Sequence, residues 1–203
     1  WDFGDGTSGS GAVVTHTCPA VGIYTATVTA TNSVDTFAAT TIVTVDEMIS
    51  GLGVVNDGPT ALGEATWFTA TVTSGSNVTY TWDFGDGDRH QGLWLVPARA
   101  VGASAVPTNT FVVSHTYTAI GRFTATFTAT NGVSTGVVTN TVVVDEVLAG
   151  LSATNDGPVM VGEQVTFSAN LTAGSNVTYT WDFGDGATGI GAIATHVYQA
   201  AGT

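Results

Sequence analysis

Trp-Asp-Phe-Gly-Asp-Gly stands three times in this chain of 203 residues, at Trp1–Gly6, Trp82–Gly87 and Trp181–Gly186. The first two copies begin 81 residues apart (82 − 1), and the next two begin 99 residues apart (181 − 82). A string that recurs together with its neighbours is typical of repeat proteins, because each copy encodes one structural unit. We therefore expect an array of similar modules rather than one large domain.

Two further strings keep the 99-residue spacing. Val45-Asp46-Glu47 recurs as Val144-Asp145-Glu146, and Gly75–Thr81 recurs unchanged as Gly174–Thr180. These strings predict short linkers that begin at Val45 and Val144. Short linkers leave neighbouring modules little freedom to move, so the array should be semi-rigid.

One copy is longer than the others between its Trp and the following His. The spacing is 15 residues from Trp1 to His16 but 33 residues from Trp82 to His115, which leaves 18 extra residues (33 − 15) in the middle copy. We predict the C-terminal part of a module over 1–46, a complete module over 47–145 with its insertion within 88–110, and the N-terminal part of a module over 146–203. The cut through both outer modules suggests a window onto a longer chain.

Apolar and polar residues alternate strictly in each copy, which predicts half-buried strands. No window favours a helix of usual length, and turns rich in Gly, Asn, Asp and Pro follow one another at intervals of about ten residues, as in a sandwich or barrel. The expected inward-facing rows of the middle module are Phe68, Ala70 and Val72; Val78, Tyr80, Trp82 and Phe84; and Phe123, Ala125, Phe127 and Ala129.

These strings together resemble the PKD domain. The resemblance rests on Val-Thr-Tyr-Thr-Trp-Asp-Phe-Gly-Asp-Gly at Val78–Gly87, His-x-Tyr at His115–Tyr117 and Thr-Ala-Thr-Asn at Thr128–Asn131, and it covers the chain apart from the insertion. It implies an all-β protein of tandem immunoglobulin-like Greek-key β-sandwiches, part of a repeat protein of a bacterial or archaeal cell surface. It also implies modules without the usual immunoglobulin disulfide, and the single cysteine, Cys18, fits that.

The charge balance restricts the partners. The net charge is −13, with three Arg and no Lys, whereas nucleic acids and anionic membrane surfaces attract basic patches. No segment approaches the ~20 apolar residues of a membrane span. We expect no nucleic-acid partner and no membrane insertion in this segment, and a surface compatible with divalent cations.

The two carboxylates of the hexapeptide have two interpretations. Asp86 lies between two glycines, where its carboxylate can accept bonds from backbone N–H groups of a turn. The alternative is a calcium site, which needs several oxygen ligands. Because some PKD modules resemble calcium binders at the linker end, such a site would join Asp83 or Asp182 to Glu47 or Glu146.

The remaining ionisable residues do not form a known catalytic pattern. His16, His115 and His196 fall at one repeated position, which favours a packing or hydrogen-bonding role. One His per module, without a second His or a Cys beside it, cannot build a zinc site. We therefore expect no enzymatic activity and no cofactor other than calcium.

The insertion and three sequons are the candidate contact and modification sites. The insertion folds back over its own sandwich, docks on a neighbouring module or another chain, or stacks Trp94 on a sugar ring. Arg and Trp are enriched at interface hot spots. Its candidate interface residues are Arg89, Leu93, Trp94, Leu95 and Arg99. Asn77, Asn170 and Asn176 match the N-glycosylation pattern, and a glycan on Asn77 or Asn176 would stand in a turn.

Two classes of function remain open. The first is a structural or adhesive repeat region of a large secreted or cell-surface protein, a semi-rigid stalk or extracellular filament that contacts copies of itself or neighbouring modules. The alternative is an accessory array of a secreted hydrolase that binds polysaccharide or other surface proteins. A third hypothesis is a cell-contact protein rigidified by calcium.

Overall fold

The computed structural model describes residues 1–94 and 109–201, and in these two ranges it contains strands and turns but no helix. The all-β prediction is therefore confirmed, and no described helix is long and apolar enough to cross a membrane. The strands of the middle module are β3 (Gly53–Asn56), β4 (Thr60–Ala61), β5 (Ala65–Val72), β6 (Val78–Asp83), β7 (Arg89–Trp94), β8 (Asn109–Thr116), β9 (Gly121–Thr130) and β10 (Thr135–Asp145).

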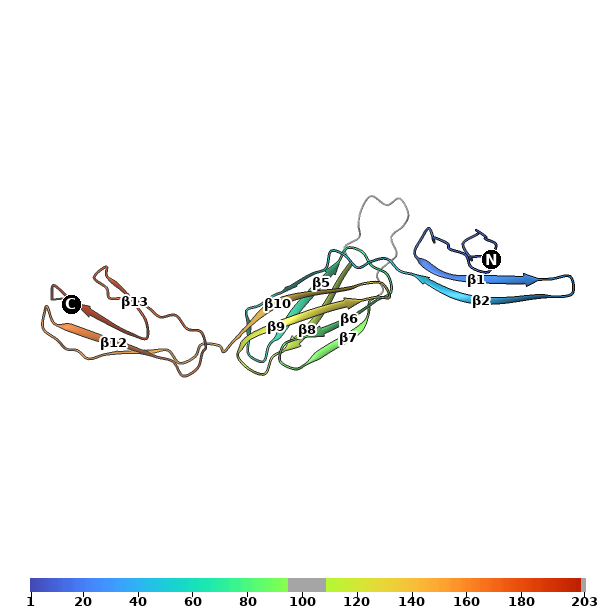
Figure 1. Ribbon diagram of the computed structural model, residues 1–203. Helices are drawn as coiled ribbons and strands as arrows, with labels where there is room; N and C mark the ends of the chain where they lie inside the picture. Colours follow the sequence, from blue (N-terminus) through green and yellow to red (C-terminus); the bar gives the residue numbers. More distant parts are fainter. Residues whose placement is uncertain (95–108, 202–203) are drawn as a thin grey trace. The chain divides into compact units, whose positions relative to one another are not determined.

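These strands form two sheets, which lie together in the centre of Figure 1. One sheet has the strand order β4-β10-β9-β6-β7 and the other has the order β3-β5-β8. Neighbours that are not consecutive in sequence show that connections cross from one sheet to the other. This is the immunoglobulin-like sandwich that the resemblance to the PKD domain implies.

The core between the sheets is built from the predicted inward rows. Phe68 on β5 is fully buried and its ring lies 5.2 Å from that of Trp82 on β6, which is fully buried too. The ring of Phe127 on β9 lies 4.8 Å from that of Trp82. Threonines fill the alternate positions of β9, where branching at Cβ suits a strand and the hydroxyl suits a wet face.

The hexapeptide turns the chain sharply at the end of β6. Gly85 has φ +84°, and a Cβ atom there would lie 2.7 Å from the carbonyl oxygen of Thr124 on β9. Gly87 has φ +105° but has open space around it. Only glycine adopts such angles readily, and at Gly85 it also lets two backbones approach closely.

The outer segments repeat parts of this plan. Residues 1–46 carry β1 (Gly22–Thr31) and β2 (Thr36–Val45), paired antiparallel from Gly22↔Val45 to Thr31↔Thr36. Residues 146–201 carry the sheets β11-β12-β15 and β13-β14. Their strands are β11 (Ser152–Asn155), β12 (Gln164–Asn170), β13 (Thr180–Asp182), β14 (Thr188–Ile190) and β15 (Ile193–Val197).

The insertion lengthens one hairpin of the middle module. Its first residues continue β7, which pairs with β6 from Asp83↔Arg89 to Val78↔Trp94, whereas the equivalent β13 and β14 pair over only three residues. Trp181 Nε1 donates to the carbonyl of Gly191 at 2.9 Å, but Trp82 Nε1 has no hydrogen-bond partner among the described residues. The two core tryptophans therefore differ in their hydrogen bonding among the described residues.

Candidate functional site

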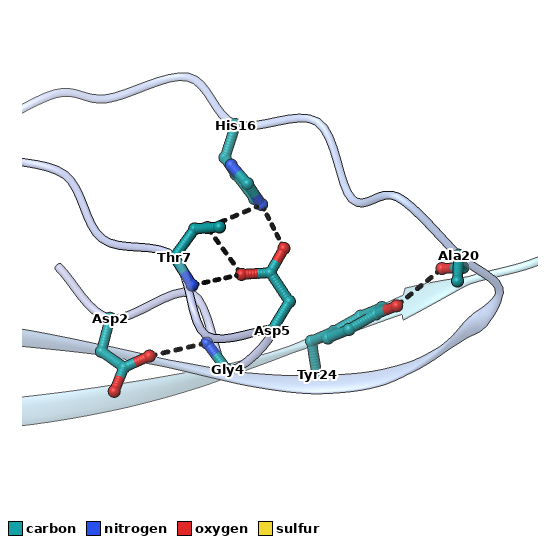
Figure 2. Close-up of polar contacts among 7 residues, drawn as sticks. All are labelled: Asp2, Gly4, Asp5, Thr7, His16, Ala20 and Tyr24. Carbon is teal, nitrogen blue, oxygen red and sulfur yellow. Dashed lines mark hydrogen bonds and ion pairs between the residues drawn. The ribbon is translucent and has the colours of Figure 1, made fainter.

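The hexapeptide carboxylates of the first segment hold a turn together. Asp5 accepts hydrogen bonds from the backbone N of Thr7 at 3.0 Å and from Thr7 Oγ1 at 2.6 Å, and its other oxygen lies 2.7 Å from His16 Nε2 (Figure 2). The ring of Phe3 stacks on His16 with 4.2 Å between centroids. Asp2 accepts a bond from the backbone N of Gly4, as Figure 2 shows.

The same arrangement recurs in the third segment. Asp185 Oδ2 lies 2.7 Å from His196 Nε2, and Phe183 stacks on that histidine at 4.5 Å. The bonds from Thr7 and His16 lower the pKa of Asp5 to about 2. The pKa of Asp185 is lowered first by its hydrogen bond to His196 and then by the backbone N of Ala187. His16 and His196 thus have the hydrogen-bonding and packing role that the sequence predicted for the repeated His.

The geometry of the His16 ring differs from that of a catalytic triad. In a triad the carboxylate holds one ring nitrogen and the nucleophile approaches the other. Here Nε2 faces both Asp5 Oδ2 at 2.7 Å and Thr7 Oγ1 at 3.4 Å. Carboxylate and hydroxyl compete for one nitrogen, so the group ties the hexapeptide turn to the segment that carries His16.

In the middle module the hexapeptide carboxylates also bond to their own turn. Asp83 accepts from the backbone N of Gly85 at 3.0 Å and Asp86 accepts from that of Asp88 at 3.1 Å. Asp83 also forms an ion pair with Arg89 at 2.8 Å. Arg89, a predicted interface residue, is therefore paired within its own hairpin.

The structure separates two pairs of the predicted calcium ligands, Glu47 from Asp83 and Glu146 from Asp182. The backbone N of Glu47 is bonded to Ser76, just before β6, whereas Asp83 ends that strand. The length of β6 separates them, roughly 15–20 Å at the usual rise per residue. In the third segment Glu146 Oε2 accepts from the backbone N of Gly174, ahead of β13, while Asp182 ends β13 and bonds to Gly184. The calcium site remains a prediction, without support from this arrangement.

A second set of polar contacts fixes the linker that precedes the middle module. Asp46 Oδ1 accepts from Ser76 Oγ at 2.9 Å and from Asn77 Nδ2 at 2.6 Å. The backbone N of Glu47 donates back to Ser76 Oγ at 2.8 Å, and Asn131 Nδ2 donates to the carbonyl of Glu47 at 2.7 Å. We call these five residues the first linker clamp.

The clamp extends along the linker. The backbone N of Ile49 donates to Ser134 Oγ at 2.9 Å. Ser50 pairs with Ser74 through backbone bonds and through a hydroxyl contact of 2.7 Å. The linker is thus bonded to the loop between β5 and β6 and to the loop between β9 and β10.

The linker that precedes the third segment has the same device. Asp145 Oδ1 accepts from Ser175 Oγ at 2.9 Å and from Asn176 Nδ2, and the backbone N of Glu146 donates to Ser175 Oγ at 2.8 Å. These four residues are the second linker clamp. Both halves of each clamp are repeated strings, so the shared 99-residue spacing was the signal that could have paired them. The sequence alone does not show that the linker contacts the loop between β5 and β6, so the two strings of each clamp were not predicted to meet.

All three segments of the chain match one known protein family. The PKD domain family matches residues 1–45, 51–144 and 150–203. The chain belongs to the PKD domain family. The matches leave residues 46–50 and 145–149 between PKD modules, and these are the residues that carry the acidic halves of the two clamps.

The chain is also similar to polycystin-1 of Homo sapiens. The two are 33% identical over 189 residues, which cover 91% of this chain and 4% of that protein. The chain therefore spans a small fraction of its relative's length. PKD modules are generally extracellular. A human relative gives no support to the bacterial or archaeal source that the resemblance implied.

The two apolar grooves in the outer PKD modules are sandwich interiors. The larger, of about 490 Å³, is lined by residues that include Ala169, Val177 and Trp181. Their counterparts 99 residues earlier, Ala70, Val78 and Trp82, are fully buried in the middle module. The groove residues are therefore core positions of the PKD fold rather than a ligand pocket.

The remaining predicted residues have varied surroundings. Asn77 and Asn176 turn their amide nitrogens to Asp46 and Asp145, while Asn170 is exposed at the end of β12. Leu93 on β7 is 62% exposed. Of Trp94 only the backbone is described, and Leu95 and Arg99 lie outside the described residues.

Proposed function

We propose that this chain is a structural or adhesive repeat region of a large secreted or cell-surface protein and that it forms part of a semi-rigid stalk or extracellular filament. The observation that carries the proposal is the linker clamp, which occurs twice at equivalent positions. A linker bonded to the following module by several side chains cannot rotate freely. An array with such linkers transmits orientation from one PKD module to the next.

The chemistry of the clamp suits this role. Asp46 and Asp145 each accept two side-chain hydrogen bonds, and bonds to an ionised acceptor are stronger than neutral ones. Each clamp needs only short polar side chains, in keeping with a chain that has no Lys. We propose that the partners are copies of this chain or neighbouring modules, that the insertion supplies a contact through Leu93 and the residues after it, and that the chain is not an enzyme.

Removal of one clamp tests the proposal. Asp46→Ala in the full chain removes the acceptor shared by Ser76 and Asn77, and Asp145→Ala does the same at the second linker. Small-angle scattering and amide exchange of residues 46–50 are measured for each variant. We expect a broader range of interatomic distances and faster exchange at the altered linker alone.

Asp35→Ala is the matched control, because Asp35 is an exposed carboxylate just before β2, whereas Asp46 follows the other end of that strand. It should leave scattering and exchange unchanged. If Asp46→Ala and Asp145→Ala also leave them unchanged, the clamps do not restrict the modules and the stalk proposal fails. Retention of the unaltered chain on insoluble polysaccharide, together with that failure, would favour the accessory array of a secreted hydrolase.

A further inference from the structure

Asn131-Gly132 is the one Asn-Gly pair in the 203 residues of the chain, and it lies in the loop between β9 and β10, at the centre of the first linker clamp. Asn-Gly is the dipeptide in which asparagine loses its amide most readily, because glycine has no side chain to hinder attack by its backbone nitrogen. The equivalent pair in the first segment is Asn32-Ser33.

The structure gives a reason for glycine at this position. A Cβ atom on Gly132 would lie 2.9 Å from Asp46 Oδ2, closer than real contacts allow. A side chain at residue 132 would require the Asp46 carboxylate to shift, so glycine suits the close approach of the linker. The same glycine makes the pair with Asn131 chemically labile.

Asn131 is at the same time the most heavily bonded side chain of the clamp. Its Nδ2 donates to the carbonyls of Glu47 at 2.7 Å and Ser76 at 2.9 Å. Its Oδ1 accepts from the backbone N of Val133 at 3.2 Å and from both the backbone N and the hydroxyl of Ser134 at 2.9 Å. In the closed clamp the amide is therefore held by five bonds.

We propose that Asn131 is a deamidation site that the closed linker clamp protects and that its modification releases the linker. The backbone nitrogen of Gly132 attacks Cγ of Asn131, the bond from Cγ to Nδ2 breaks, and ammonia leaves with the proton that the attacking nitrogen loses. Water then opens the cyclic imide and leaves aspartate or isoaspartate. Water is the only co-reactant, and no oxidation or reduction occurs.

The product cannot make the same contacts. The amide nitrogen that donates to the carbonyl oxygens of Glu47 and Ser76 becomes a carboxylate oxygen, which cannot donate to them. A second negative charge also arises in the residue next to Gly132, which the Asp46 carboxylate approaches. Like charges and facing acceptors repel, so the linker separates from the module. This inference rests on the proposed role of the clamp in restraining the linker.

The rate of deamidation should report how often the clamp opens, because the bonds to Nδ2 must break before the amide can react. Ser76→Ala removes the hydroxyl that joins Asp46 to Glu47 and leaves the Asn131 side chain intact. Ser175→Ala makes the same change in the second clamp, which lies on another linker. It is the matched control.

Full-length chains are incubated at mildly alkaline pH, and the peptide that contains Asn131 is followed by mass spectrometry. We expect Asn131 to react more slowly in the native chain than in the chain unfolded in urea. Ser76→Ala should speed the reaction roughly fivefold or more, from the loss of two hydrogen bonds, while Ser175→Ala matches the unaltered chain. Equal rates in all three native chains would overturn the proposal.

A second variant keeps the two proposals separate. Asn131→Asp mimics the product, and exchange of residues 46–50 should rise to the level of Asp46→Ala. Slow exchange in Asn131→Asp would overturn the release of the linker. If Ser76→Ala alters the reaction rate at Asn131 but scattering shows no added freedom, the stalk proposal fails while the protected modification site stands.

Discussion

Gly85→Ala should destabilise the middle module by more than Gly87→Ala, although both remove a glycine with positive φ from one turn. Forcing a residue with a side chain into a left-handed conformation costs about 1–2 kcal/mol. At Gly87 this backbone strain should be the whole loss of stability, because nothing lies within 4 Å of the added Cβ.

At Gly85 a contact with the partner strand adds to this cost. The added Cβ would lie 2.7 Å from the carbonyl oxygen and 3.0 Å from the nitrogen of Thr124, which are backbone atoms and cannot rotate away. Forced displacement in a packed site costs roughly 1–3 kcal/mol more. We therefore expect a loss of about 2–5 kcal/mol in the free energy of unfolding for Gly85→Ala.

Urea unfolding of the full chain measures both variants, and amide exchange of β6 and β9 assigns the loss to the middle module. The first copy repeats this contact, since a Cβ on Gly4 would lie 2.7 Å from the carbonyl oxygen of Thr25. Equal losses for Gly85→Ala and Gly87→Ala would show that the approach to Thr124 is unimportant, and the account of the turn would be refuted.

Other outcomes follow from burial and charge. Phe68→Ala should lower the free energy of unfolding in urea by about 3–5 kcal/mol, because the ring is fully buried against Trp82 and Phe84. Trp67→Ala should lower it much less, because the Trp67 side chain is 52% exposed. Comparable losses would contradict the sandwich core. The folded pKa of Asp5 lies at about 2, below its ordinary value of 3.8, so the stability that its ionised form contributes is present above about pH 4 and lost as the pH falls toward 2. The pKa of Asp185 is lowered too, so its turn should lose stability in the same direction. Amide protection factors of the two turns, which are corrected for the intrinsic dependence of exchange on pH, should stay constant over this range in Asp5→Asn and Asp185→Asn. Arg89→Ala should change the free energy of unfolding by less than about 1 kcal/mol, because its ion pair with Asp83 is solvent-exposed, and a larger loss would mean that Arg89 has a further role.

The sequence by itself determined the module, its repetition and its core. Alternation in rows such as Phe123, Ala125 and Phe127 sets which face of a strand is buried, because side chains on a strand point to opposite faces in turn. The glycines of the hexapeptide determined the turn after β6, since few other residues adopt its angles. These are local properties, and a linear pattern is enough to state them.

Only the tertiary structure decided which polar residues meet. Asp46, Asn77 and Asn131 come from a linker and two loops that lie tens of residues apart in sequence, and each alone is an ordinary surface residue. The sequence offered Asp83 or Asp182 with Glu47 or Glu146 as an alternative calcium site, and the length of β6 separates Glu47 from Asp83. Contacts between loops depend on how strands of different sheets bring their ends together, and the alternation within a strand carries no information about that. The linker clamp and its labile Asn131-Gly132 pair are therefore consequences of the folded sandwich.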